Sequence, residues 1–214
     1  MIDRKINSLK FPYERYDEVS DYALAYFRDH DRAWKNLDMI ALGDAFEALR
    51  DCYKKRRWVY VCGNGGSAAI ANHFLCDHGK LIATGTTIKP KVYSLSGSME
   101  MMSALGNDIS FDESFSHPLR NMGEAGDVLF TISASGDSEN VVRAIKVAKE
   151  TGIKSIALTA FDGGRSSKEA DINIHFPAYN YGIAEDLHQG IMQILAQFIR
   201  QLEMTSEDIK LENF

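Results

Sequence analysis

The stretch WVYVCGNGGSAAIANHF, residues 58–74, decides the fold class of this chain. It begins with a short apolar run typical of a buried strand, breaks at the turn Gly63–Gly66 and continues as a helix to about His78. Ser67 is expected to be the N-cap of that helix. Residues 127–152, DVLFTISASGDSENVVRAIKVAKETG, repeat this order, and Gly152 is expected to end the second helix. Apolar strands that alternate with helices predict a parallel α/β sheet with right-handed crossovers.

The other elements follow from the same patterns. We expect three more strands, at 92–95, 155–159 and 172–176. A short helix is predicted at 98–105 and a long last helix at 182–202. Two amphipathic helices, at roughly 12–30 and 34–56, are predicted before the first strand. Their apolar faces need a partner, which is either a homo-oligomeric helical bundle or the chain's own domain. We therefore expect a helical extension over 1–57, an α/β domain over 58–203 and a polar, frayed tail over 204–214.

Composition and charge limit the classes of function. The chain has 214 residues, of which 45% are hydrophobic and 25% are charged, as in an ordinary globular domain. A net charge of −6 argues against electrostatic binding of nucleic acid. No apolar run approaches the length of a membrane span, and the charged N-terminal residues lack the apolar region of a signal peptide. The three cysteines form no C-x-x-C pair, so no disulfide is expected and the cytoplasm is the expected compartment.

Both small-residue turns are candidates for phosphate binding, because ligands of parallel sheets bind beyond the carboxyl ends of the strands. The glycines of the first turn let the backbone approach a ligand, and the helix N-terminus that follows favours anions. The second turn, Ser133–Ser138, adds three hydroxyls but no lysine or arginine. The alternative is that the glycines serve packing and that Ser138 is a plain N-cap.

Two such turns in one sheet favour an elongated polar ligand with a phosphate at one end. The glycine turn has neither the spacing of a Walker A loop nor that of a dinucleotide-binding motif. No nucleotide cofactor is therefore expected.

Four stretches together resemble the sugar isomerase (SIS) domain family, and within it the phosphoheptose isomerase branch. They are VCGNGGSAAIANHF (61–74), LGNDISFDESFSHPL (105–119), GDVLFTISASGDSENVVRAIKVAKETGI (126–153) and IALTAFDGG (156–164). The resemblance implies a flavodoxin-like sheet in three layers, a homotetramer joined partly through the N-terminal helices, and a phosphorylated sugar as the ligand. The implied reaction is the ketose–aldose isomerisation of sedoheptulose 7-phosphate or a related sugar phosphate through an enediol.

The resemblance also assigns substrate-binding residues, position by position. They are Asn64, Gly65, Gly66, Ser67, Asn107, Asp108, Ser133, Ala134, Ser135 and Ser138. Ala134 stands where the family usually has Thr, so one hydroxyl is missing while the backbone of the phosphate loop remains.

The family's zinc ligands are a His and a Glu four residues apart, followed by a Gln and a His eight apart. Here these positions are His73, Asp77, Glu185 and Gln193, and the Glu and His positions are also the family's general base and general acid. The resemblance thus places catalysis on Asp77, Glu185 and Gln193. One imidazole, two carboxylates and an amide oxygen are donors for one divalent metal, zinc in the family, although oxygen donors are less selective for zinc. The alternative for His73 is a satisfied buried histidine.

Two functions from different classes remain open. Asp77 and Gln193 depart from the family's base and acid, which favours a non-catalytic SIS protein that binds a phosphosugar or a protein partner, as the replication-initiator-associating members do. An amide cannot donate and recover a proton as an imidazole does, and His188 lies about 140° from Gln193 around the last helix. Polar side chains at all four positions favour an isomerase-like enzyme. We predict the enzyme, with Asp77 or Glu185 as its base.

Overall fold

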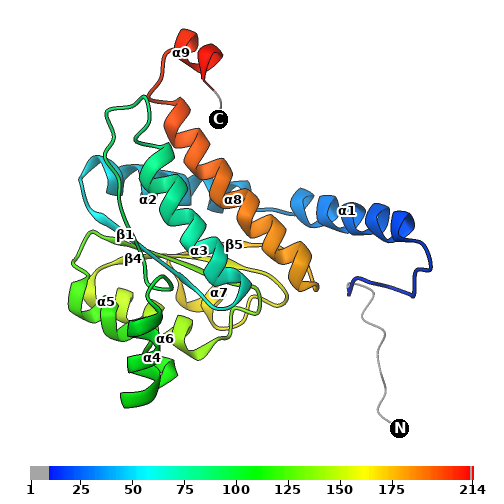
Figure 1. The fold of residues 1–214 in the computed structure, drawn as a ribbon, viewed down its shortest axis with the longest axis horizontal. Helices are drawn as coiled ribbons and strands as arrows, with labels where there is room; N and C mark the ends of the chain where they lie inside the picture. The colour runs from blue at the N-terminus through cyan, green and yellow to red at the C-terminus, as the bar shows by residue number, and fades with distance from the viewer. Residues whose placement is uncertain (1–9, 213) are drawn as a thin grey trace.

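The computed structural model describes residues 10–212 and 214 of the chain. Its centre is a sheet of five parallel strands in the order β2-β1-β3-β4-β5 (Figure 1). The strands are β1 (Trp58–Gly63), β2 (Lys91–Ser94), β3 (Val128–Ser133), β4 (Lys154–Thr159) and β5 (Ile172–His175). Every strand bound lies within one residue of its prediction. The α/β fold class with a parallel sheet is therefore confirmed.

Helices cover both faces of this sheet. One face carries α2 (Met39–Lys54), α3 (Gly66–Cys76) and α8 (Tyr181–Gln201), and the other carries α5 (Ser116–Met122) and α6 (Glu139–Thr151). Alternate strand residues enter the two cores, since Val59 and Val61 pack with the first set of helices and Tyr60 and Cys62 with the second. The flavodoxin-like arrangement in three layers is therefore confirmed.

Shorter elements connect these layers. They are α4 (Met99–Asp108), a 3₁₀ turn (Phe111–Glu113), α7 (Ser166–Glu169) and α9 (Ser206–Leu211). Across the described part of the chain, every helix is too short or too polar to pass through a bilayer.

The N-terminal helices have different surroundings. Helix α1 (Val19–Lys35) projects away from the sheet, whereas α2 packs on it and buries Leu49 and Tyr53 in the core (Figure 1). The predicted start of the first helix near residue 12 is wrong, because residues 12–18 are not helical. Tyr16 stands at helical spacing from Val19 and Ala23, but its ring packs from this irregular segment, with centroids 6.2 Å from Phe11 and 5.5 Å from Tyr22. The apolar residue at position 16 is therefore explained by packing between aromatic rings and not by a helix.

The start of α3 also differs from its prediction. Gly65, with φ of 54°, is the N-cap, and Ser67 lies buried in the first turn. Glycine adopts this left-handed conformation without strain, so the helix begins before the serine that capping preference selects. At its other end α3 continues into a π-helical turn over Asp77–Leu81.

The C-terminal tail is more ordered than predicted. Residues 206–211 form α9, and Thr205 caps it. The Thr205 hydroxyl accepts from the backbone N–H of Asp208, while the Asp208 carboxylate accepts from the backbone N–H of Thr205. The expectation of fraying is wrong for this segment, because the reciprocal capping bonds satisfy amides at the start of the helix.

Two fully buried histidines lie at α8, one packed against it and one within it. His78 accepts a hydrogen bond from the Tyr53 hydroxyl at Nδ1 (2.8 Å), donates from Nε2 to the Met192 carbonyl oxygen (3.1 Å) and stacks on Phe74. His188, on α8, makes at most a weak contact with the Thr159 backbone and no hydrogen bond of ordinary geometry among the described residues. Burial lowers the pKa of His78 to about 3 and that of His188 to about 4.

Acid is therefore expected to destabilise the fold. Histidines of the unfolded chain bind a proton near pH 6.5. In the folded state His78 stays neutral down to about pH 3 and His188 down to about pH 4. Between these values and pH 6.5 the unfolded state therefore binds more protons than the folded state. The free energy of unfolding should fall by about 1.4 kcal/mol per pH unit per histidine as pH drops below 6.5.

Substitution His188→Leu tests this pH dependence. It should remove about half of the histidine contribution to the slope and change stability at pH 7.5 by less than about 1 kcal/mol, because a buried imidazole with at most one weak contact, to the Thr159 backbone, is replaced by an apolar side chain. Urea unfolding between pH 7.5 and 5 measures both quantities. An unchanged slope in the variant would contradict the assignment.

Candidate functional site

A small pocket lies at the carboxyl edge of the sheet, where β1 and β3 end. It has a volume of about 150 Å³. Three segments form it: the glycine turn (Gly63–Gly66) with the start of α3, the serine loop (Ser133–Ser138) before α6, and the start of α8. Its lining residues are Asn64, Ser67, Ile132, Ser133, Ala134, Ser135, Ser138, Tyr181 and Glu185. The structure thus brings most of the predicted substrate-binding residues to one place.

The glycine turn brings backbone and a carboxylate close together. A Cβ on Gly63 would stand 2.7 Å from the Ser67 carbonyl oxygen, and a Cβ on Gly66 would stand 2.3 Å from Glu185 Oε1. A residue with a side chain at position 66 would therefore displace the Glu185 carboxylate from the turn. Asn64 is held by a reciprocal amide pair with the buried Asn140, at 2.9 and 3.0 Å.

The serine loop is held by backbone geometry. Gly136 has φ of 64°, and a Cβ there would stand 2.0 Å from the carbonyl oxygen of Gly163 in the loop after β4. Ser138 occupies the N-cap of α6, but its hydroxyl makes no capping bond in the described structure. The side chain of Ser138 therefore does not act as a plain cap, and it lines the pocket at a helix N-terminus, where anions are favoured.

A second group of side chains lies further along α3 and α8, which run side by side (Figure 1). The Gln193 amide donates to Asp77 Oδ2 at 2.7 Å, and His73 Nε2 lies 3.1 Å from the same oxygen. Gln189 Nε2 lies 2.8 Å from His73 Nδ1. If Gln189 donates to Nδ1, the neutral His73 ring carries its proton on Nε2, the nitrogen that lies beside Asp77. We call these four residues the helix cluster.

Glu185 does not join the helix cluster. It lies eight residues before Gln193 on α8, which is a rise of about 12 Å along the helix. The resemblance implied that the two side chains share one metal, but this rise separates them. Glu185 lies at the glycine turn instead.

The donors that do converge are a poor fit for the family's metal. Among the residues described, no three His, Cys, Asp or Glu side chains come together as a metal site. His73 and Asp77 bind each other, Gln189 holds the second nitrogen of His73, and Gln193 presents an N–H donor. Zinc sites in proteins use His, Cys and carboxylate ligands, commonly four of them. The helix cluster does not fit that set, so no catalytic step is derived through a metal.

Two predicted binding residues lie outside the pocket. Asn107 and Asp108 are exposed at the end of α4, where the Asn107 amide donates to Asp108 Oδ1 at 2.7 Å. His188 is buried against Phe176, so it does not replace the missing acid at Gln193.

Tyr181, Gln189 and Asn140 belong to this region but were not predicted. Gln189 had a signal in the sequence, because residues 185, 189 and 193 repeat at a spacing of four and share one helix face. Asn140 had no such signal, since its partner Asn64 lies 76 residues away.

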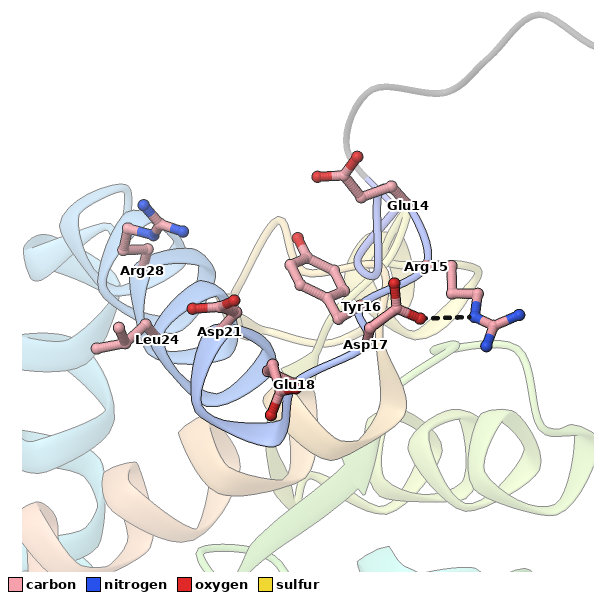
Figure 2. Close-up of a pocket in the computed structure, with 8 residues that line it drawn as sticks. All are labelled: Glu14, Arg15, Tyr16, Asp17, Glu18, Asp21, Leu24 and Arg28. Carbon is pink, nitrogen blue, oxygen red and sulfur yellow. Dashed lines mark ion pairs between the residues drawn. The ribbon is translucent and has the colours of Figure 1, made fainter.

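A larger hollow than the pocket lies elsewhere, beside the segment before α1 (Figure 2). It measures about 520 Å³ and is lined by four carboxylates, from Glu14, Asp17, Glu18 and Asp21, and by two arginines. One of these arginines, Arg15, pairs with Asp17 at 3.2 Å. Its acidic lining makes it a poorer place for a phosphate than the serine loop, in spite of its size.

The fold and the pocket define a class of protein: a doubly wound parallel sheet with a helix N-terminus, a position that favours anions, beside a pocket at its carboxyl edge. The family model described as SIS domain matches residues 25–160. The chain belongs to the SIS domain family.

Several relatives carry a more specific name. Phosphoheptose isomerase from Enterobacter sp. (strain 638) is 37% identical over 163 residues, which are 75% of this chain and 83% of that protein. Phosphoheptose isomerase from Escherichia coli (strain K12 / DH10B) matches with the same identity and coverage.

Solved structures agree with the fold. Phosphoheptose isomerase GmhA from Neisseria gonorrhoeae superposes with a TM-score of 0.78 at 29% identity and covers 86% of this chain and 100% of its own. A phosphoheptose isomerase from Francisella tularensis gives a TM-score of 0.76 at 29% identity and covers 86% and 97%.

Proposed function

We propose that this chain is a phosphosugar isomerase that interconverts the ketose and aldose forms of sedoheptulose 7-phosphate or a closely related sugar phosphate. One observation carries the proposal: the serine loop and the glycine turn line one pocket, and an imidazole–carboxylate pair lies further along the two helices that border it. The names of the relatives support the same reaction. The alternative, a non-catalytic SIS protein that binds a protein partner, is not favoured.

On this proposal, uncharged hydrogen-bond donors, which are serine hydroxyls and backbone amides, bind the phosphate. Ser133, Ser135 and Ser138 line the pocket at the start of α6, and its lining includes no lysine or arginine. Hydroxyl and amide donors suit a phosphate that must be released after each turnover. Ala134 adds no hydroxyl but leaves its backbone in the loop.

On this proposal, residues of the helix cluster carry out the proton transfer. The hydrogen bond from Gln193 and the close approach of His73 Nε2 both involve Oδ2 of Asp77, which leaves Oδ1 as the oxygen that takes the proton from C1 of the ketose. The His73 imidazole beside it can exchange a proton with the neighbouring sugar oxygens. Gln193 holds Asp77 in place, and Glu185, nearer the serine loop, binds sugar hydroxyls. A phosphosugar held by its phosphate must have a long carbon chain to reach Asp77, which favours a heptose.

The divalent metal implied by the resemblance remains a prediction outside this mechanism. Its four positions do not converge within one chain, and three of them are satisfied by one another or by Gln189. The assay below therefore includes arms with and without zinc.

The assembly and compartment are also proposals. Helix α1 exposes Val19, Leu24 and Phe27, at 83, 66 and 66% of their surface, and such a face suits contacts between copies in a homotetramer. Cys52, Cys62 and Cys76 are unpaired, as expected in a reducing cytoplasm.

The central experiment incubates the purified chain with sedoheptulose 7-phosphate and follows the aldose by NMR, with and without added zinc. Aldose formation that depends on the protein supports the proposal. Absence of turnover in both arms contradicts it.

The double substitution Ser135→Ala and Ser138→Ala should weaken phosphosugar binding about tenfold to a hundredfold. It removes two hydroxyl donors, each of which contributes roughly 0.5–1.5 kcal/mol. Thermal stabilisation of the protein by sedoheptulose 7-phosphate reports the affinity without turnover. Ser103→Ala, an exposed serine on α4, is the matched control and should leave binding unchanged. Unaltered affinity in the double variant would contradict phosphate binding at the serine loop.

A further inference from the structure

The serine loop contains one charged residue, Asp137, although the ligand proposed for it is an anion. Ser135 and Ser138 line the pocket on either side of this residue in the sequence, but Asp137 itself does not. Its carboxylate lies on the outer side of the loop, where it meets Arg165 from the loop after β4.

Arg165 holds the start of α6 with its whole guanidinium group. Nε donates to Asp137 Oδ1, Nη2 donates to the Asp137 carbonyl oxygen at 2.7 Å, and Nη1 donates to Glu139 Oε2 at 2.6 Å. The hydrogen bond from Arg165 holds the pKa of Asp137 below its usual range. The second oxygen of Glu139 accepts from Arg143 at 2.8 Å. Arg165 thus bridges the two carboxylates beside the serine loop, and Glu139 pairs with Arg143 as well.

The backbones of the two loops are joined at the same place. The Ser166 N–H donates to the Gly136 carbonyl oxygen at 2.8 Å, and Gly136 lies directly against Gly163 and Gly164. Arg165 is therefore carried by a segment whose position is fixed relative to the serine loop.

Folding stability does not account for this ion pair. The side chains of Arg165 and Asp137 are 45% and 59% exposed, and an exposed pair of this kind contributes little to the stability of a fold. The ion pair is expected to affect the binding of a dianion more than it affects the stability of the fold. A free carboxylate in the loop would repel the phosphate, and a neutralised one held outside the pocket does not.

We propose that Arg165 is a positioning residue for phosphate recognition, which holds the Asp137 carboxylate on the outer side of the serine loop and neutralises it so that the loop accepts a phosphate dianion. This inference rests on the proposed function, because it takes the serine loop as the phosphate site. It assigns no contact between Arg165 and the substrate.

The test uses the full chain and four variants: Arg165→Leu, Asp137→Asn, the combination of both, and Arg165→Lys. The affinity for sedoheptulose 7-phosphate is measured by calorimetry, and KM and kcat are measured in the isomerase assay. Arg165→Leu should raise Kd and KM about five- to tenfold with kcat nearly unchanged, the size expected for one uncompensated charge near an exposed anion site. Arg165→Lys keeps the charge and should raise them by less than about threefold.

The combined variant decides between charge and structure. Removal of the Asp137 charge should restore Kd and KM to within about threefold of the unmodified chain. If Arg165 only braces the loop, the combined variant will bind as poorly as Arg165→Leu, and the proposal is overturned. Unchanged binding in Arg165→Leu overturns it as well.

Two controls separate this inference from the proposed function. Arg57→Leu removes a comparable exposed arginine, paired with Glu124 at 3.0 Å on a remote surface, and should change neither constant. The unmodified chain is measured first. If it binds no sugar phosphate, the proposed function fails. If it binds but Asp137→Asn does not rescue Arg165→Leu, only the role of Arg165 fails.

Discussion

Replacement of Asp77 by Asn is expected to lower kcat for sedoheptulose 7-phosphate by about 10²- to 10⁴-fold, the usual contribution of a general base. The amide has the shape of the carboxylate and can still accept from Gln193, so the helix cluster should keep its geometry. It cannot take up a proton from carbon. Thermal stabilisation by the phosphosugar should therefore persist while turnover is lost.

Two further variants sharpen this result. Asp51→Asn removes an exposed carboxylate on α2 that pairs with Lys55, and it should leave kcat and KM unchanged. Glu185→Gln restores the residue type that the family resemblance implies at this position and should alter KM more than kcat. If Asp77→Asn retained turnover while Glu185→Gln abolished it, the base would be Glu185 and the assignment of Asp77 would be wrong.

Substitution Gly136→Ala is expected to have the second large effect, because the new Cβ would stand 2.0 Å from a backbone oxygen of Gly163. Neither backbone can yield without separation of the serine loop from the loop after β4. Positive φ adds strain for any residue with a side chain, of roughly 1–3 kcal/mol. We expect the unfolding free energy to fall by at least this amount and phosphosugar affinity to drop by about a hundredfold, since small displacements of positioning groups are costly.

Gly43→Ala is the matched control for this substitution. Gly43 is exposed within α2, and a Cβ there meets nothing within 4 Å. Alanine should stabilise that helix by roughly 0.5–1 kcal/mol and leave binding unchanged. Denaturant unfolding and calorimetry measure the two effects for both variants. A Gly136→Ala protein with ordinary affinity would show that the contact between the two loops does not position the phosphate site.

The sheet could be predicted from the sequence because buried parallel strands are continuous apolar runs. The stretches at 58–62 and 127–132 are almost entirely buried and mostly apolar, and their bounds were correct within one residue. The ends of helices were predicted less well, because they depend on the backbone conformation of single residues. Ser67 has the right chemistry for an N-cap, but the left-handed backbone at Gly65 starts the helix earlier.

The site could be predicted where it depends on local sequence. The serine loop, the glycine turn and the shared face of His73 and Asp77 each lie within a few residues of chain, and the structure places His73 Nε2 3.1 Å from Asp77 Oδ2. Contacts between distant segments could not be found in this way. Gln189 lies 116 residues from His73, and Arg165 lies 28 residues from Asp137.

The parallel course of α3 and α8 has a consequence for substrate size. Three contacts join the helices in order: Glu185 at Gly66, Gln189 at His73, and Gln193 at Asp77. On the proposed function, the phosphate would bind at the serine loop, and each successive contact lies further from it along the helices. A triose or tetrose phosphate bound there would extend only as far as Glu185, and its carbonyl would not reach Asp77. Selection among sugar phosphates would then depend on carbon count more than on the stereochemistry of single hydroxyls.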